Sequence, residues 1–159
     1  KANRIDVPRP ALYGDIRNYL LTYWKAEEVN GMEADDAMGI AQDTDTIICT
    51  IDKDLDTIPG WHYNWVKDEY YHVDDVQAAW NFYVQMLTGD TADNICGLRK
   101  VGPVKAAKIL AAGPDAHTAA VDAYQEYYGE DWEEAWDCNE KLLGILYEAK
   151  TEGSTGVPS

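Results

Sequence analysis

The side chains best suited to chemistry in this sequence are carboxylates in three short clusters. They are Glu33, Asp35 and Asp36, then Asp52 and Asp54, then Asp90 and Asp93. Carboxylates two or three residues apart can share a hard cation, and oxygen ligands select Mg²⁺ or Mn²⁺. If the clusters converge, their mutual repulsion requires divalent cations as compensation. Such two-metal sites cleave phosphodiesters by activating a water and stabilising the leaving oxygen.

Two of these clusters also have simpler explanations. Carboxylates are favoured in the first turn of a helix without any metal, which would account for the Glu33 cluster. Aspartates are common in turns, which would account for Asp52 and Asp54. However, Asp52 follows directly after a β-branched run, and open α/β sheets bind ligands at the carboxyl ends of their strands. That position favours a site over a simple turn.

A basic window follows the third cluster. Residues 94–114 contain no Asp or Glu, although the whole 159-residue chain has a net charge of -16. The basic side chains surround a turn at Gly102 and are Arg99, Lys100, Lys105 and Lys108. The charge of the whole chain argues against generic nucleic-acid binding. The local arrangement instead indicates a metal site beside a clamp for backbone phosphates.

Length and composition predict one domain with enough apolar residues, 46%, to form a core. The sequence has no apolar window of transmembrane length and no signal region, which favours a cytoplasmic protein. Cys49, Cys96 and Cys138 are odd in number and lack metal-ligand spacing. They are expected to be reduced, buried thiols.

The elements that must position these residues follow from hydrophobic spacing and capping residues. The predicted helices cover residues 11–28, 32–42, 74–87, 103–111, 115–128 and 132–149. A buried parallel strand is predicted over 46–51, and an aromatic hairpin over 61–66 and 70–73. Packing is the favoured role of the hairpin aromatics, with base stacking as the alternative, and His62 and His72 are expected to be ordinary polar residues. Residues 151–159 are predicted to be a disordered tail.

Taken together, these motifs resemble the structure-specific 5′-nuclease family. That family includes bacteriophage 5′-3′ exonucleases, flap endonucleases and the 5′-nuclease domain of bacterial DNA polymerase I. The resemblance covers residues 1–112 and rests on Glu33-Ala34-Asp35-Asp36, residues 50–56, residues 89–95, and Gly97 with the Gly102/Lys105 turn. It implies an α/β, PIN-like fold with a partial parallel sheet, followed by a helix–hairpin–helix-type DNA-binding region. The short intervening loops are most similar to the phage branch.

The resemblance also implies roles for individual residues. Glu33, Asp35 and Asp36 correspond to the first-metal group, with Asp52 shared or nearby. Asp54, Asp90 and Asp93 correspond to the second-metal side. Lys1 and Arg4 match the Lys-x-Asn-Arg at the base of the family's helical arch, where both contact the scissile phosphate and stabilise developing charge.

The basic window resembles the family's helix–hairpin–helix turn. There, backbone amides and basic side chains hold duplex phosphates, often with a K⁺ ion, which is expected here at the Gly97–Lys105 turn. The side chains and backbone implied in DNA binding are Arg99, Lys100, Gly102, Lys105 and Lys108. Lys100-Val101-Gly102 stands where the family usually has Gly-hydrophobic-Gly, so one glycine is missing.

The sequence departs from the family at its beginning. The family has further aspartates on strands N-terminal to the arch, and those strands would precede Lys1. Without them the first metal has fewer ligands and the sheet lacks central strands, so a second polypeptide could complete the site. The expected division is a nuclease core with an arch remnant over 1–93 and a helical duplex-binding region over 94–150.

Three hypotheses follow. The first is a two-metal 5′-3′ exonuclease or flap endonuclease acting on DNA in phage-type replication or degradation, in the host cytoplasm. The second is a non-catalytic DNA-binding or partner subunit that keeps the fold. The third is an acidic protein that binds cations or mimics DNA, which poorly explains the acid-free basic window.

Overall fold

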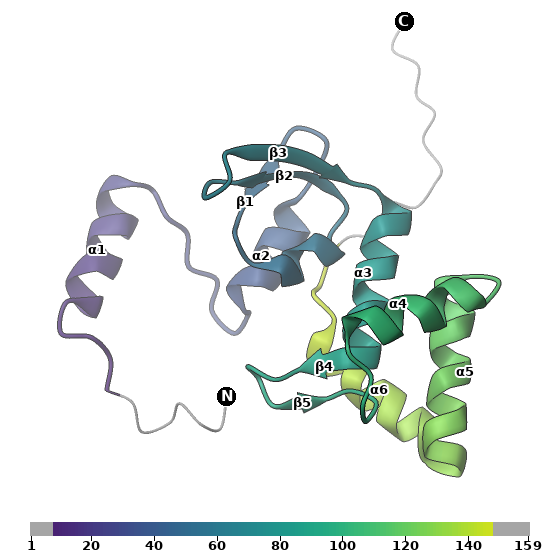
Figure 1. Ribbon diagram of the computed structural model, residues 1–159. Coiled ribbons are helices and arrows are strands. Elements are labelled where there is room, and N and C mark those ends of the chain that lie inside the picture. The colour runs from purple at the N-terminus through teal and green to yellow at the C-terminus, as the bar shows by residue number, and fades with distance from the viewer. Residues whose placement is uncertain (1–7, 148–159) are drawn as a thin grey trace, which may run out of the picture.

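The computed structural model describes residues 8–147, which form two parts joined by a long helix (Figure 1). The sheet part contains α2 (Ala34–Ala41), β1 (Ile47–Cys49), the 3-10 helix η2 (Lys53–Thr57), β2 (Gly60–Asn64) and β3 (Glu69–Val73). The helical part contains α3 (Asp75–Thr88), β4 (Gly89–Asp90), β5 (Ile95–Cys96), α4 (Pro103–Ala112), α5 (Ala116–Tyr128), η3 (Gly129–Asp131) and α6 (Trp132–Leu143). Helix α1 (Tyr13–Tyr23) lies to one side of both parts.

The three-stranded sheet has the order β1-β2-β3, with β1 parallel to β2 and β2 antiparallel to β3. The predicted aromatic hairpin is therefore confirmed. Its aromatic residues pair across the strands, and the rings of Tyr63 and Tyr70 stack 4.4 Å apart. His62 is fully buried, and its Nε2 lies 2.9 Å from the Ile58 carbonyl oxygen. Packing thus accounts for the pattern of aromatic residues, since cross-strand pairs stabilise a sheet.

The strand predicted over 46–51 is parallel, as expected, but it is not buried on both faces. Strand β1 has three residues and forms one edge of the described sheet. Ile48 is buried against Leu55 and Ile58, whereas Ile47 is 48% exposed. The continuous β-branched run therefore misled the prediction, because within residues 8–147 one side of the strand has nothing packed on it.

The helical part has the larger core. Its buried residues come from α3, α4, α5 and α6 and include Met86, Leu87, Leu110 and Tyr124. The Tyr124 hydroxyl donates to the Met86 carbonyl oxygen at 2.7 Å and accepts from Asn139 Nδ2 at 2.9 Å. Burial raises the pKa of this phenol to about 12, so it stays a neutral donor.

Capping residues explain where these helices begin. Asp74 accepts from the Gln77 amide at the start of α3, and Asp115 accepts from the Thr118 amide at the start of α5. Pro103 occupies the first turn of α4, where its missing N–H leaves no internal hydrogen bond unmade. The predicted helices over 74–87, 103–111 and 115–128 are confirmed to within two residues.

The last predicted helix, 132–149, is wrong beyond Leu143. Helix α6 ends there, and Gly144 caps it in extended conformation. Residues 144–147, termed the strap, then run back to the sheet part, where Ile145 packs on the small core and the Leu146 amide donates to Asp36 Oδ1 at 2.8 Å. Helical spacing of apolar residues could not distinguish this extended segment from a further helical turn.

Two further expectations need correction. Helix α1 is shorter than the predicted 11–28, and none of its residues is buried. Cys49, Cys96 and Cys138 are free, as expected, but all three are exposed rather than buried. In residues 8–147, no helix combines the length and the apolar character needed to cross a membrane. Lys1, Arg4 and the predicted tail lie outside the described residues.

Candidate functional site

Six of the seven predicted metal-site carboxylates line one pocket of about 420 Å³, termed the acidic pocket. They come from three places in the fold and are Glu33, Asp35, Asp36, Asp54, Asp90 and Asp93. The start of α2 supplies three, η2 supplies one, and the β4–β5 hairpin supplies two. The structure therefore brings together clusters that lie up to sixty residues apart in the sequence.

The first turn of α2 orients its carboxylates through backbone contacts. Glu33 is the N-cap residue in extended conformation, and Asp35 Oδ1 accepts from the Asp36 amide at 3.1 Å. Asp36 Oδ1 accepts the Leu146 amide of the strap. Gly39 makes room for this contact, because a Cβ at that position would lie 2.3 Å from the Leu146 carbonyl oxygen.

The surroundings of Asp54 disfavour its ionised form. Burial raises its pKa, and the negative charges of Asp52 and Asp90 raise it further, while Lys53 and a hydrogen bond from Gln85 oppose them. Like charges that destabilise an ionised carboxylate are a common feature of functional sites. Asp52 itself does not line the pocket, because its Oδ1 caps η2 by accepting from the Asp54 amide at 3.1 Å.

The β4–β5 hairpin of the helical part supplies Asp90 and Asp93 to the acidic pocket. Asp90 Oδ1 accepts from the Ala92 amide at 2.7 Å, and the loop closes with Asn94 at a φ of 61°. The base of the hairpin requires glycine, because a Cβ on Gly89 would lie 2.2 Å from the Gly97 nitrogen. The hairpin did not appear in the sequence prediction, since two-residue strands leave no alternation to detect.

The acidic pocket suits a divalent cation in donor type and in charge. Hard carboxylate oxygens surround it, and their mutual repulsion would be relieved by a cation. However, across residues 8–147 no three Asp, Glu, His or Cys side chains converge closely enough to hold a metal ion. The side chains line the same cavity without forming a closed ligand cluster.

Two lining residues were missed by sequence reasoning. Gln85 donates from Nε2 to Asp54 Oδ1, and Lys141 of α6 also lines the acidic pocket. Gln77, Asn81 and Gln85 recur every four residues on α3, a spacing that places amides on one helix face and could have identified Gln85. No comparable spacing identified Lys141, because its approach to the acidic pocket depends on how α6 packs.

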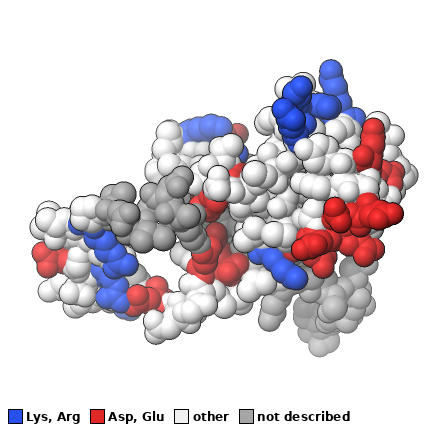
Figure 2. Space-filling model, turned by 90° about the horizontal axis from the view of Figure 1, so that it is seen from below, with Lys and Arg blue, Asp and Glu red and all other residues white. Residues whose placement is uncertain are grey.

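The basic window forms the turn before α4. Lys100 adopts a φ of 62°, the left-handed region in which glycine is usual, at the position where the resemblance led us to expect a glycine. Gly102 caps α4 without a side-chain hydrogen bond, and a shallow cavity there is lined by Gly102–Lys105 and Lys108. In Figure 2, basic and acidic side chains gather in separate groups on the helical side of the molecule.

Comparisons with known proteins bear on the family and the fold of the chain. No family model matches the chain. A DNA polymerase I of Rhizobium leguminosarum is 32% identical over 136 residues, a match that covers 74% of this chain and 13% of the polymerase.

Two solved structures of T5 proteins are also similar. A T5 5′-exonuclease variant matches with a TM-score of 0.58 and 18% identity over 86% of this chain and 63% of its own. A T5 D15 protein co-crystallised with metal ions matches with a TM-score of 0.49 and 20% identity over 72% of this chain and 49% of its own. The match to the T5 exonuclease confirms the predicted α/β fold, while the helix–hairpin–helix assignment stays a prediction.

Proposed function

Because the chain belongs to the 5′-nuclease family, we propose that it hydrolyses phosphodiester bonds at 5′ ends or flaps of DNA with the help of divalent cations. The observation that carries the proposal is the acidic pocket, where six carboxylates from three separate motifs meet. The chain spans 63% of the T5 exonuclease chain and 13% of the polymerase, so the activity is proposed for these residues and not transferred from a whole relative.

In this proposal the carboxylates hold two Mg²⁺ or Mn²⁺ ions. Glu33, Asp35 and Asp36 take one side of the acidic pocket, and Asp54, Asp90 and Asp93 take the other. Bound there, the ions would supply a nucleophilic hydroxide from water and stabilise the leaving oxygen. Gln85 and the strap orient Asp54 and Asp36, since each donates a hydrogen bond to one carboxylate oxygen. Asp52 acts through Asp54, whose amide it holds.

The basic turn would hold the duplex beside the acidic pocket. The amides at the start of α4 have no side-chain cap, so they are available to a phosphate together with Arg99, Lys100, Lys105 and Lys108. A K⁺ ion at the Gly97–Lys105 turn and contacts from Lys1 and Arg4 to the scissile phosphate remain part of the proposal. Neither relative points to a second polypeptide, so the proposal concerns the chain alone.

The test is cleavage of a 5′-labelled flap DNA with Mg²⁺, with Mn²⁺ and with EDTA. Asp90→Asn should lower the rate at least about 100-fold, because it removes a ligand charge from the acidic pocket without changing side-chain volume. Asp137→Asn, an exposed change on α6 with the same charge difference, should leave the rate unchanged. An active Asp90→Asn variant, or metal-independent cleavage, would contradict the proposal.

A second candidate is a DNA-binding protein without catalysis. It is favoured by the absence of a closed three-ligand cluster among residues 8–147. In that case the wild type would bind duplex DNA in a salt-sensitive way, weakened by Lys105→Ala and Lys108→Ala, and would cleave nothing with either metal. An acidic cation-binding protein would neither cleave nor bind DNA.

A further inference from the structure

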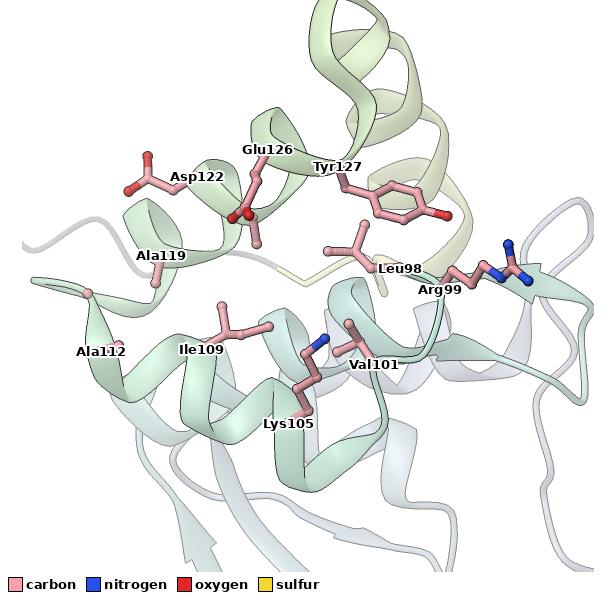
Figure 3. Close-up of a pocket in the computed structure, with 12 residues that line it drawn as sticks. Leu98, Arg99, Val101, Lys105, Ile109, Ala112, Ala119, Asp122, Glu126 and Tyr127 are labelled. Carbon is pink, nitrogen blue, oxygen red and sulfur yellow. The ribbon is translucent and has the colours of Figure 1, made fainter.

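A groove of about 520 Å³ lies between α4 and α5, and it shares no lining residue with the acidic pocket (Figure 3). Its floor is apolar, with Leu98 and Ala119 buried and Val101 and Ile109 partly buried. At one end the helices close together, because a Cβ on Gly113 would lie 2.6 Å from Ala119 Cβ. The volume lies within the range of pockets that hold small molecules.

The two walls of the groove carry opposite charges. Asp122 and Glu126 belong to α5, while Lys105 belongs to α4 and Arg99 to the turn before it. Within residues 8–147, none of these four makes an ion pair or a side-chain hydrogen bond. In Figure 3, Glu126 reaches from α5 toward α4, and Lys105 reaches from α4 toward α5. The groove is therefore open to a ligand that is anionic at one end and donates hydrogen bonds at the other.

An exposed aromatic ring stands at the open end. Tyr127 is 48% exposed, and in Figure 3 its ring extends beside Leu98 in the direction of Arg99. Such a ring, next to an apolar floor, is a stacking surface for a planar heterocycle. Lys105 also lines the shallow cavity at the start of α4, so the groove is continuous with the basic turn.

We propose that this groove binds one unpaired nucleotide of the DNA, next to the duplex held by the basic turn. Its phosphate lies between Arg99 and Lys105, its base stacks on Tyr127 above the apolar floor, and its Watson–Crick edge donates to Glu126. The inference rests on the proposed function, because the basic turn must first hold DNA. It adds a site outside the acidic pocket that distinguishes a duplex end with a single-stranded extension from a blunt one.

The chemistry of Glu126 sets a preference among bases. A carboxylate accepts two parallel N–H groups well, and guanine offers N1–H and its 2-amino group side by side. Cytosine and adenine offer one amino group, and thymine offers one ring N–H. These edges are occupied in a duplex, so the groove reads unpaired bases, with guanine first. A basic peptide would fit less well, since Arg99 and Lys105 would repel it.

Binding of labelled duplexes to the full chain tests the proposal. One duplex is blunt, and the others carry three-nucleotide extensions of dG or dT on either strand. The wild type should bind the dG extension about 5- to 150-fold more tightly than the blunt duplex, the range expected for stacking one base on an aromatic ring. Tyr127→Leu should remove that difference while blunt-duplex binding stays the same.

Glu126→Gln isolates the carboxylate. It should reduce the difference in affinity between duplexes with dG and dT extensions. Glu130→Gln makes the same charge change at an exposed position outside the groove and should leave that difference unchanged. Equal affinity for blunt and extended duplexes would overturn the proposal. An extension preference that survives Tyr127→Leu would overturn it as well.

A titration of isotope-labelled protein with dGMP separates this proposal from the proposed function. Amide shifts at Leu98, Ile109 and Ala123 should follow dGMP and should be weaker with dTMP. If extended duplexes bind and these shifts occur but no flap DNA is cleaved, the groove stands and the proposed function falls. If dGMP shifts none of them, or a Lys-rich peptide shifts them and dGMP does not, the groove proposal is wrong.

Discussion

The sheet part and the helical part differ in how they are held together. The helical part buries residues from four helices, including Tyr124 with its two hydrogen bonds. The buried residues of the sheet part's core are Ile48, Leu55 and Ile58, with Met38 and Ile145 packed against them. One of these supports, Ile145, comes from the strap that follows the helical part. We therefore expect the helical part, termed the base, to be stable without the sheet part, and the smaller sheet part, termed the dependent part, to rely on the base.

The acidic pocket lies where the two parts meet. Asp35 and Asp36 belong to the dependent part, whereas Asp90 and Asp93 belong to the base. The basic turn and the groove belong wholly to the base. The acidic pocket should therefore be more sensitive than the basic turn to any loss of contact between the parts, and the following predictions test how far each part depends on the other.

The largest expected effect comes from removing a core side chain in each part. Ile58→Ala and Leu110→Ala truncate residues that are 1% and 2% exposed, and each should lower the free energy of unfolding by about 2–5 kcal/mol. Hydrogen exchange should then differ, because Leu110→Ala should increase exchange in both parts while Ile58→Ala should increase it mainly in the sheet part. Equal increases throughout α4–α6 in both variants would show one cooperative unit instead.

A smaller effect is expected where the strap crosses α2. Gly39→Ala places a methyl group against the Leu146 carbonyl oxygen, so the strap must move. After the gain in helix propensity, the net loss should be about 1–2 kcal/mol, measured by urea unfolding. Gly14→Ala, in α1 with nothing within 4 Å of the added carbon, is the control and should be neutral or stabilising. If Gly39→Ala leaves the Leu146 amide protected from exchange, the strap does not depend on this contact.

The smallest effect concerns the turn of the base. Lys100→Gly should raise the free energy of unfolding by about 0.5–1 kcal/mol, because a side chain at a φ of 62° is strained and glycine is not. Arg99→Gly removes the same charge at a position without positive φ, and it should lower stability by a similar amount. Thermal unfolding of both variants measures the two changes in stability. A change of the same sign in both variants would contradict the prediction.

Much of the base could be predicted from the sequence because its helices are marked by residues that lie close together in the sequence. Asp74, Pro103 and Asp115 mark helix starts through contacts within a few residues, and the apolar residues that follow recur at helical spacing. The three acidic motifs were recognisable for the same reason, since each lies within a few consecutive residues. Their meeting in one pocket followed from the resemblance and from no local rule.

The unpredicted features depend on contacts between distant residues. The Leu146 amide bonds to a side chain 110 residues earlier, and no spacing rule reports such a contact. The β4–β5 hairpin depends on the close approach of Gly89 and Gly97, which the sequence shows only as two glycines. Exposure of the cysteines also depends on what packs against them, so composition alone gave the wrong answer.

The strap is synthesised after the other segments that line the acidic pocket. Residues 33–36 leave the ribosome early, and the β4–β5 hairpin follows, but the wall formed by Lys141–Ile145 and the amide that holds Asp36 come last. Since chains begin to fold while they are being made, α3, α4 and α5 can pack together before this wall exists. The acidic pocket is thus completed only when the strap emerges from the ribosome. Until then, the carboxylates of a growing chain lack the wall formed by Lys141–Ile145 and the amide that holds Asp36.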